Sequence, residues 1–162
     1  ENACERVRFL RWSMSDLAAL PGEFDVIFSS VAVHYVQDFP ALMRAAADHL
    51  TEGGRLIFSQ EHPLVSAHCG GERWTKNAQG EKLHLNLANY GIEGERETTW
   101  FVDNVKIYHR TFSTIVNTLA EAGFTITGML EPLPTEALLK KHPEHRDLLH
   151  KPDFLLVKST RA

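Results

Sequence analysis

Residues 24–30 and 55–60 read FDVIFSS and RLIFSQ, and these two short runs decide the fold. Both place apolar side chains one after another rather than in alternation, which is typical of strands buried on both faces of a parallel sheet. Between the runs, apolar residues recur every three or four positions, as along one face of a helix: Phe39, Leu42, Met43, Ala46, Ala47 and Leu50. The order strand, helix, strand predicts one unit of an α/β sheet.

The residues that flank this helix support its boundaries. Asp38 stands where an N-cap belongs, and Pro40 falls in the first turn, where proline is tolerated. Gly53 and Gly54 are expected to end the helix before the second strand begins.

The pattern continues on both sides of this unit. A second helix is predicted over residues 113–122, and Gly123 marks its end. Residues 124–130 alternate in polarity as an edge strand does, residues 154–158 form another buried run, and residues 7–10 are a weaker strand candidate. We therefore expect one domain over residues 1–162 with a doubly wound α/β sheet.

Residues 62–108 interrupt this alternation without a helical period. Long interruptions after a strand are usually functional or mobile. A small hairpin is expected from residues 95–101 and 105–108 around Asp103 and Asn104. In open α/β sheets the ligand lies at the carboxyl ends of the strands, and we interpret residues 62–108 as an insertion that covers this edge.

Composition narrows the class of protein. The chain has 162 residues, of which 43% are hydrophobic and 23% charged, and its formal net charge is −4. The negative charge argues against nucleic acid as a partner, and no apolar run is long enough for a membrane span. We expect a cytoplasmic protein in which Cys4 and Cys69 are reduced thiols. The spacing of the nine histidines predicts no metal site.

The stretch LPGEFDVIFSSVAVHYVQDFPALMRAAADHLTEGGRLIFSQEHP, residues 20–63, resembles the class I S-adenosylmethionine-dependent methyltransferases, in particular those similar to ubiquinone and menaquinone biosynthesis enzymes. The matching features are Phe24-Asp25, His34-Tyr35-Val36 and the Gly53-Gly54 pair. Family members commonly carry Lys-Pro where this chain has Thr51-Glu52. Further similarity to one small-molecule subgroup lies in three short motifs: Glu61-His62-Pro63, Tyr108-His109-Arg110-Thr111 and Glu131-Pro132.

The resemblance implies a Rossmann-like sheet that is mostly parallel with an antiparallel last strand, and S-adenosyl-L-methionine as cofactor. It also implies that the fold is incomplete at the N-terminus. The family's first strand ends in a glycine-rich turn and its second in an acidic residue, and neither precedes Val7. The chain begins at Glu1 without a methionine, so roughly 70 to 90 residues are expected to precede it. On this view the fragment alone is inactive.

The cofactor would occupy two segments. Asp16 matches an acidic position near the adenine, although the alignment could slip toward Met14 or Ser15, and Asp16 could instead cap a turn. At the end of the strand over residues 24–30, backbone carbonyls and small side chains could approach the cofactor; the second set of candidates is Ser29, Ser30, Val31 and Tyr35.

The acceptor would lie beside the insertion. Candidate substrate-binding residues are Glu61, His62, Tyr108, His109 and Arg110, with Arg110 suited to an anion. His34 could take a proton from the acceptor, or it could be a packed residue. The five candidate substrate-binding residues could equally well form a structural network that braces the insertion. Trp74 and Trp100 could line an apolar pocket or anchor the loop.

The leading hypothesis is methyl transfer from S-adenosylmethionine to a small organic molecule. A nicotinamide-dependent dehydrogenase shares the doubly wound sheet but would end in a parallel pair of strands. A third alternative is a non-enzymatic binding module, either degenerate or completed by another chain. The acceptor and the oligomeric state are left open by the sequence.

Overall fold

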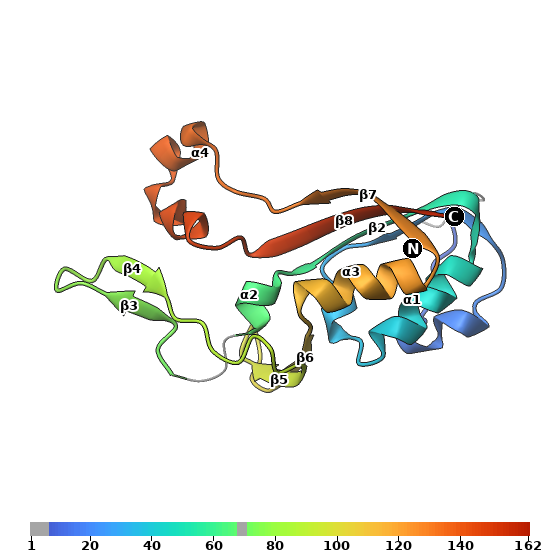
Figure 1. The fold of residues 1–162 in the computed structure, drawn as a ribbon, viewed down its shortest axis with the longest axis horizontal. Coiled ribbons are helices and arrows are strands. Elements are labelled where there is room, and N and C mark those ends of the chain that lie inside the picture. Colours follow the sequence, from blue (N-terminus) through green and yellow to red (C-terminus); the bar gives the residue numbers. More distant parts are fainter. Residues whose placement is uncertain (1–6, 68–70) are drawn as a thin grey trace.

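The main sheet has four strands, which lie in the order β1-β2-β8-β7 in a computed structural model that describes residues 7–67 and 71–162. Their bounds are β1 (Phe24–Ser29), β2 (Leu50–Glu61), β7 (Phe124–Leu130) and β8 (Phe154–Arg161). β1 pairs in parallel with β2, and β8 is antiparallel to both β2 and β7. β1, β2 and β7 therefore share one direction, and the predicted mixed α/β sheet with an antiparallel last strand is confirmed (Figure 1).

The core lies between the sheet and two helices, α1 (Phe39–Asp48) and α3 (Phe112–Glu121) (Figure 1). The 3₁₀ helix η1 (Met14–Ala19) packs beside α1 and contributes Met14 and Leu17 to the margin of the core. Phe39 of α1 meets Phe58 of β2 edge to face, with ring centroids 6.2 Å apart. These helices lie over one face of the sheet, and their apolar side chains pack against that face from β2 to β8.

Both helices begin with a capped first turn. The Asp38 carboxylate accepts a hydrogen bond from the Ala41 amide at 2.8 Å, and the Thr111 hydroxyl caps α3 through the Thr114 amide. α3 is followed by Gly123, whose φ of +84° is the left-handed conformation that glycine adopts most readily. The second predicted helix is therefore confirmed to within one residue at each end.

The Gly53-Gly54 pair does not end α1, which stops at Asp48. Both glycines lie inside β2, where Gly53 has a φ of +73°. A Cβ on Gly54 would stand 2.7 Å from the Thr51 carbonyl oxygen. The pair is needed for the irregular start of β2, where the register with β1 shifts between Phe24 and Val26.

The expectation that the strands are buried on both faces is wrong for β1. Phe24, Val26 and Phe28 point to the face away from the helices and are 39%, 50% and 70% exposed. The reason is that α1, α3 and η1 cover only one face, and no other described element covers this part of the second. β1 is also an edge strand of the described sheet.

The weak strand expected over residues 7–10 is absent. Residues 7–13 are described and have no regular structure, and Val7, Phe9 and Leu10 are exposed. A strand needs a neighbour for its backbone hydrogen bonds, and β1 is paired only with β2.

The segment over residues 62–108 forms α2 (Pro63–Ser66) and two hairpins. The first consists of β3 (Trp74–Lys76) and β4 (Lys82–Leu85). The second consists of β5 (Gly94–Thr98) and β6 (Val105–His109), which confirms the hairpin around Asp103 and Asn104. Asn104 has a φ of +60°, as residues in tight turns often do.

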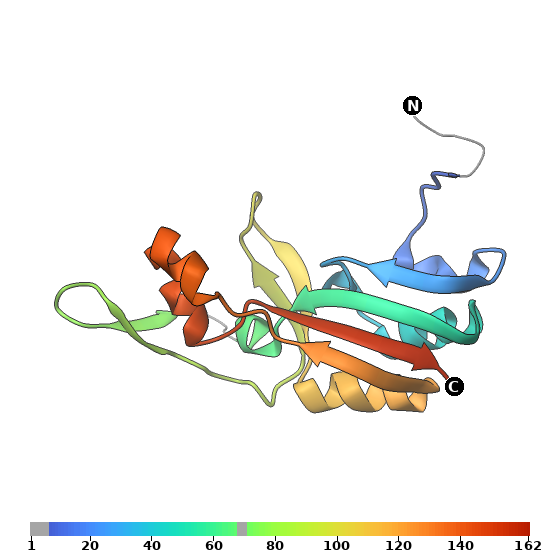
Figure 2. The ribbon, with the colours of Figure 1, turned by 90° about the horizontal axis from the view of Figure 1, so that it is seen from above.

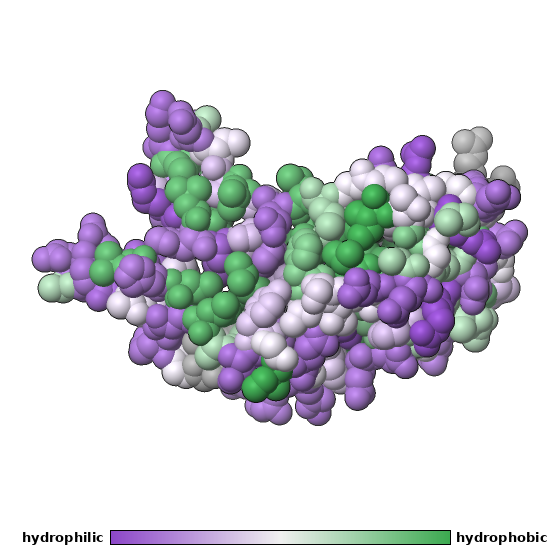
Figure 3. Space-filling model, viewed as in Figure 1, coloured by the Kyte–Doolittle hydropathy of each residue, from purple (hydrophilic) through white to green (hydrophobic). Residues whose placement is uncertain are grey.

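Two arms project from one end of the sheet (Figures 1 and 2). One is the β3–β4 hairpin, and the other carries α4 (Glu136–Lys141) and the 3₁₀ helix η3 (Pro143–Leu149). They are joined by the ion pair of Lys82 with Asp147, at 2.5 Å, and by the edge-to-face contact of Trp74 with His150. Figure 3 shows hydrophobic surface on these arms and on the body beside them.

Within the described ranges, no helix is both long and apolar enough to cross a membrane. The predicted reduced thiols, Cys4 and Cys69, lie outside the described residues.

The packing predicts a large difference between two leucines. Leu119 of α3 is fully buried, and Leu119→Ala should lower the free energy of unfolding by about 3 kcal/mol because the core cannot refill the space. Leu133, at 54% exposure, is the matched control, and Leu133→Ala should cost less than about 1 kcal/mol. Urea denaturation followed by circular dichroism measures both, and equal losses would contradict this description of the core.

Candidate active site

Two hollows meet at the carboxyl ends of β1 and β2. The first, which we call the apolar shelf, has a volume of about 270 Å³ and lies against the uncovered face of the sheet. The second, which we call the polar cleft, has a volume of about 1230 Å³ and lies between the strand ends and the β5–β6 hairpin. Ser30, Val31 and Phe154 line both hollows, so that they form one continuous site.

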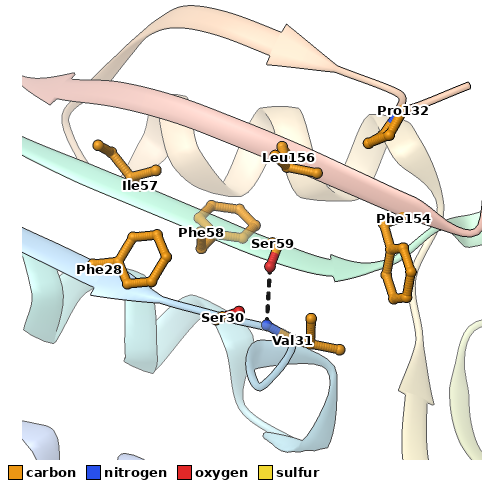
Figure 4. A pocket seen from close by; sticks show the side chains of 9 residues that line it. All are labelled: Phe28, Ser30, Val31, Ile57, Phe58, Ser59, Pro132, Phe154 and Leu156. Atoms are coloured by element: carbon orange, nitrogen blue, oxygen red, sulfur yellow. Dashed lines mark hydrogen bonds between the residues drawn. The ribbon is translucent and has the colours of Figure 1, made fainter. Parts of the chain in front are cut away.

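The apolar shelf is built by alternate residues of three adjacent strands. Phe28 of β1 stands beside Ile57 of β2, and Leu156 of β8 lies on the same face two residues further along, opposite Ser59 (Figure 4). Pro132 and Phe154 close the end of the shelf toward the polar cleft. A flat apolar surface of this kind can bind the face of an aromatic ring.

Val31 holds the turn between the two hollows in a strained conformation. Its φ of +49° is rare for a β-branched residue and costs on the order of 1–3 kcal/mol. The Val31 amide donates to the side-chain oxygen of Ser59 (Figure 4) and also to the backbone oxygen of Ser59, each at 3.0 Å. These bonds turn the chain sharply where β1 ends, and such strain is common at ligand-binding sites.

The polar cleft has one wall from the sheet and one from the insertion. Tyr35, from the 3₁₀ helix η2 (Val33–Tyr35), and Glu61, the last residue of β2, stand on the sheet side. On the insertion side the charged residues are Arg73, Arg96 and Glu97, and apolar contact comes from Val65, Trp100 and Ile107.

Glu61 is a half-buried carboxylate of this cleft. Burial raises the pKa of Glu61 above its ordinary value; Arg73 and Lys151 oppose that rise, and Asp153 adds to it. Burial and the nearby Glu61 also raise the pKa of Tyr35. Glu61 is therefore a stronger proton acceptor than an exposed glutamate when it is ionised.

His34 does not line either hollow, unlike its neighbour Tyr35. Its side chain is 3% exposed, and its Nδ1 accepts a long hydrogen bond of 3.4 Å from the Glu61 amide. Burial, with a smaller effect of Arg110, lowers the pKa of His34 to about 4. The structure thus matches the alternative interpretation of His34, as a packed residue that stays neutral near pH 7.

The three short motifs of the resemblance come together in a polar network below the cleft. His62 Nε2 lies 2.8 Å from Glu131 Oε1, and His62 Nδ1 accepts from the Leu64 amide at the start of α2. His109 is fully buried between the Ser66 hydroxyl, at 2.8 Å, and the Tyr90 carbonyl oxygen, at 2.9 Å. Both imidazoles have partners on each nitrogen, so they brace α2 and β6 rather than face a ligand.

Arg110 is also occupied. Its guanidinium donates to the carbonyl oxygens of Val36 and Gln37, and it stands over the Phe39 ring at 4.9 Å. Burial lowers the pKa of Arg110 to about 10. Tyr108 donates to Glu95 on the far side of the hairpin, at 3.3 Å. Of the five predicted substrate-binding residues, only Glu61 lines the cleft.

The predicted adenine segment is not part of the continuous site. Met14 and Ser15 line a separate hollow of about 180 Å³ between η1 and α1. Asp16 is exposed, and its backbone oxygen accepts a hydrogen bond from the Trp12 indole at 2.9 Å. Of the strand-end candidates, Ser30, Val31 and Tyr35 line the site, whereas Ser29 pairs with Phe58 inside the sheet.

Arg73 and Arg96 are cleft residues that the sequence analysis missed. The alternation of β5 contains a usable signal, because Arg96 and Thr98 share the face of the buried Ile107, while Glu95 and Glu97 face the other way. Nothing in the local sequence marks Arg73. Trp100 lines the cleft, whereas Trp74 packs in the arm against His150 and Lys82.

Potential metal ligands gather at one place in the described part of the chain. The ligand atoms of His142, Glu144 and His145 lie within 4.8 Å of one another, and all three residues are exposed. They lie outside the continuous site, and the absence of a metal site stays a prediction.

The strand order, the antiparallel last strand and the site at the carboxyl ends define the class as an α/β Rossmann-like methyltransferase fold. A family model described as a methyltransferase domain matches residues 6–128, and the chain belongs to this family. The antiparallel pair of β7 with β8 removes the support for a dehydrogenase.

Two solved structures are similar to this chain over nearly all of its length. One is from Listeria monocytogenes and is assigned as an S-adenosylmethionine-dependent methyltransferase; it has 31% identity and a TM-score of 0.85, over 100% of this chain and 72% of its own. The other, an S-adenosylmethionine-dependent methyltransferase from Mesorhizobium loti, has 38% identity and a TM-score of 0.80, over 90% and 67%.

A curated relative, an uncharacterized protein from Haemophilus influenzae, is 43% identical over 147 residues. That match includes 90% of this chain, which spans 58% of the relative's length.

The burial of His34 predicts a pH effect on stability. The pKa of His34 is lower in the folded than in the unfolded chain, so between these two pKa values only the unfolded chain binds a proton at His34. The free energy of unfolding therefore falls as the pH drops from about 6.5 toward 4. At pH 4.5 this loss is about 2 kcal/mol relative to pH 7.5. His34→Gln should remove it, as measured by urea denaturation at the two pH values. The exposed His142→Gln is the control, and an equal acid loss in His34→Gln and the unmodified chain would refute the assignment.

Proposed function

We propose that the intact protein transfers a methyl group from S-adenosylmethionine to a small organic molecule, in line with the small-molecule subgroup that the sequence resembles. The observation that carries the proposal is the continuous site, in which an apolar shelf and a large polar cleft meet at the strained turn of Val31. When bound, the cofactor supplies a methyl group already activated by the positive charge of its sulfonium.

The residues of this chain can form one side of a binding site for such a cofactor. The shelf formed by Phe28, Ile57 and Leu156 offers an apolar surface, and Ser30 and Val31 place backbone and small side chains at its margin. Tyr35 stands in the adjoining cleft. We assign these residues to one wall of the cofactor site, and the polar cleft to the acceptor. Met14, Ser15 and Asp16 remain candidates only for an adenine contact made from a separate hollow.

We infer that the second wall comes from chain upstream of residue 1. Two features support this: β1 is an edge strand with exposed Val26 and Phe28, and the chain spans 58% of its curated relative. An edge strand with apolar side chains is normally covered in the native protein. Under this proposal the 162-residue chain contains the acceptor side of the site and only part of the cofactor side.

Calorimetric titration of S-adenosylmethionine tests this division. The full-length protein should bind the cofactor, and the 162-residue chain should bind at least about a hundredfold more weakly, because half of the contacts are missing. S-adenosylhomocysteine serves as a second titrant. Equal affinity of the two forms would show that the described wall is sufficient and would overturn the inference.

We further propose that Glu61, rather than His34, receives the proton of the acceptor. The acceptor's nucleophilic atom would take the methyl group from the sulfonium, which would leave as a neutral thioether, and the proton that the acceptor loses would pass to the Glu61 carboxylate. Glu61 lines the cleft, whereas His34 is sealed from it. The rest of the work is positioning and exclusion of water.

Glu61→Gln in the full-length protein tests this role. It should lower kcat by about 10²- to 10⁴-fold, because an amide accepts a proton poorly. In the unmodified protein kcat should also fall as the pH drops below the raised pKa of Glu61, and the variant should lose this acid limb. Transfer of labelled methyl to a small-molecule extract provides the assay, and the exposed Glu52→Gln is the control. An unchanged rate and profile in Glu61→Gln would exclude the role.

A further inference from the structure

The charges of the polar cleft are unevenly compensated. Four charged residues line it: Glu61, Arg73, Arg96 and Glu97. Glu61 lies within the field of Arg73, which lowers its pKa against the effect of burial. Glu97 lies opposite Lys106 in the hairpin, on the face away from Arg96, and Lys106 itself forms an ion pair with Glu95 at 3.0 Å. Of the two cleft carboxylates, Glu61 thus has a cation nearby, and Glu97 is directed away from Arg96.

Arg96 has no such counter-charge. Among the described residues it forms no ion pair, and its hydrogen bonds go to the backbone oxygens of Glu95, at 3.1 Å, and Ile92. A guanidinium carries five N–H groups, so most of its donors are unused. One of them, the Nε–H, is buried and has no partner. Arg96 is half-buried in the wall of the cleft, so an anion in the cleft can accept hydrogen bonds from the guanidinium donors that the protein leaves unused.

The residues around Arg96 also indicate which kind of carbon skeleton an anionic ligand of this cleft would carry. Ile107, 4% exposed, lies on the same face of the hairpin, and Trp100 and Val65 add apolar surface to the same cleft. Thr98 and Thr99 offer hydroxyl groups nearby. A ligand that fits combines one anionic group with an apolar or aromatic carbon skeleton.

We propose that the polar cleft binds a small organic acid, and that its anionic group pairs with Arg96 while Arg73 adds a second positive charge. The proposal rests on methyl transfer as the proposed function, for which it names the acceptor class. The acid's nucleophilic group would lie toward Glu61, and its anionic group toward the insertion. The planar fork of arginine suits a carboxylate, which can accept two parallel hydrogen bonds from it.

Benzoate and benzamide are suitable probes, because they share size and shape and differ in charge. Their dissociation constants are measured by NMR titration of the full-length protein at pH 7.5 and low salt. Benzoate should bind about tenfold more tightly than benzamide. Arg96→Gln should abolish this preference, and Arg73→Gln should reduce it about threefold. Arg44→Gln is the matched control, because Arg44 is exposed on α1 outside the cleft, and it should leave the preference unchanged.

Equal affinities for the two probes, or a full preference for benzoate in folded Arg96→Gln, would overturn the proposal. If Arg96→Gln does not fold, Arg73→Gln decides, and an unchanged preference in that variant overturns it. These measurements need no cofactor, so they separate the two claims. A preference for benzoate that depends on Arg96, in a protein that transfers no methyl group, would retain the anion site and remove the proposed function.

Discussion

The constraint on which the structure depends is the one-sided burial of the sheet. Phe39, Leu119 and Phe58 fill the seam between α1, α3 and the strands, and each is at most 1% exposed. Burial of this kind is the main favourable term in folding. Because the seam fixes β1 and β2 against the helices, their carboxyl ends are held in register. The residues that line the site, among them Ser30, Val31 and Glu61, stand at or just beyond these strand ends.

At this edge polar contacts help to attach the insertion to the sheet. Arg110, at the end of β6, ties the hairpin to the carbonyl oxygens that follow η2. His109 and His62 join α2 to β6 and to the loop after β7. A buried polar network that is fully paired favours one arrangement over its alternatives, because any displacement leaves donors or acceptors unsatisfied. The distance between the two walls of the polar cleft therefore depends on Arg110, His109 and His62, which do not line the cleft.

Sequence reasoning predicted the fold better than the site. The strands over residues 24–30, 55–60, 124–130 and 154–158 and both helices follow from hydrophobic period and capping, which are local properties, as Asp38 and Gly123 illustrate. The antiparallel last pair is instead an implication of the family resemblance. The histidines and Arg110 were predicted as ligand-binding residues because of their chemistry, but chemistry does not reveal which way a side chain faces. Arg96 shows the reverse case, because its orientation depends on a strand pairing that only the folded hairpin establishes. The failure at Gly53-Gly54 has the same origin, since a glycine pair can end a helix or kink a strand.

The open side of β1 has a consequence for handling the molecule. Its outer N–H and C=O groups have no neighbouring strand in the described part of the chain, and Val26 and Phe28 stand exposed beside them. Such a strand is a template on which another extended chain can add. Self-association of the 162-residue chain at high concentration would then be expected at this open edge.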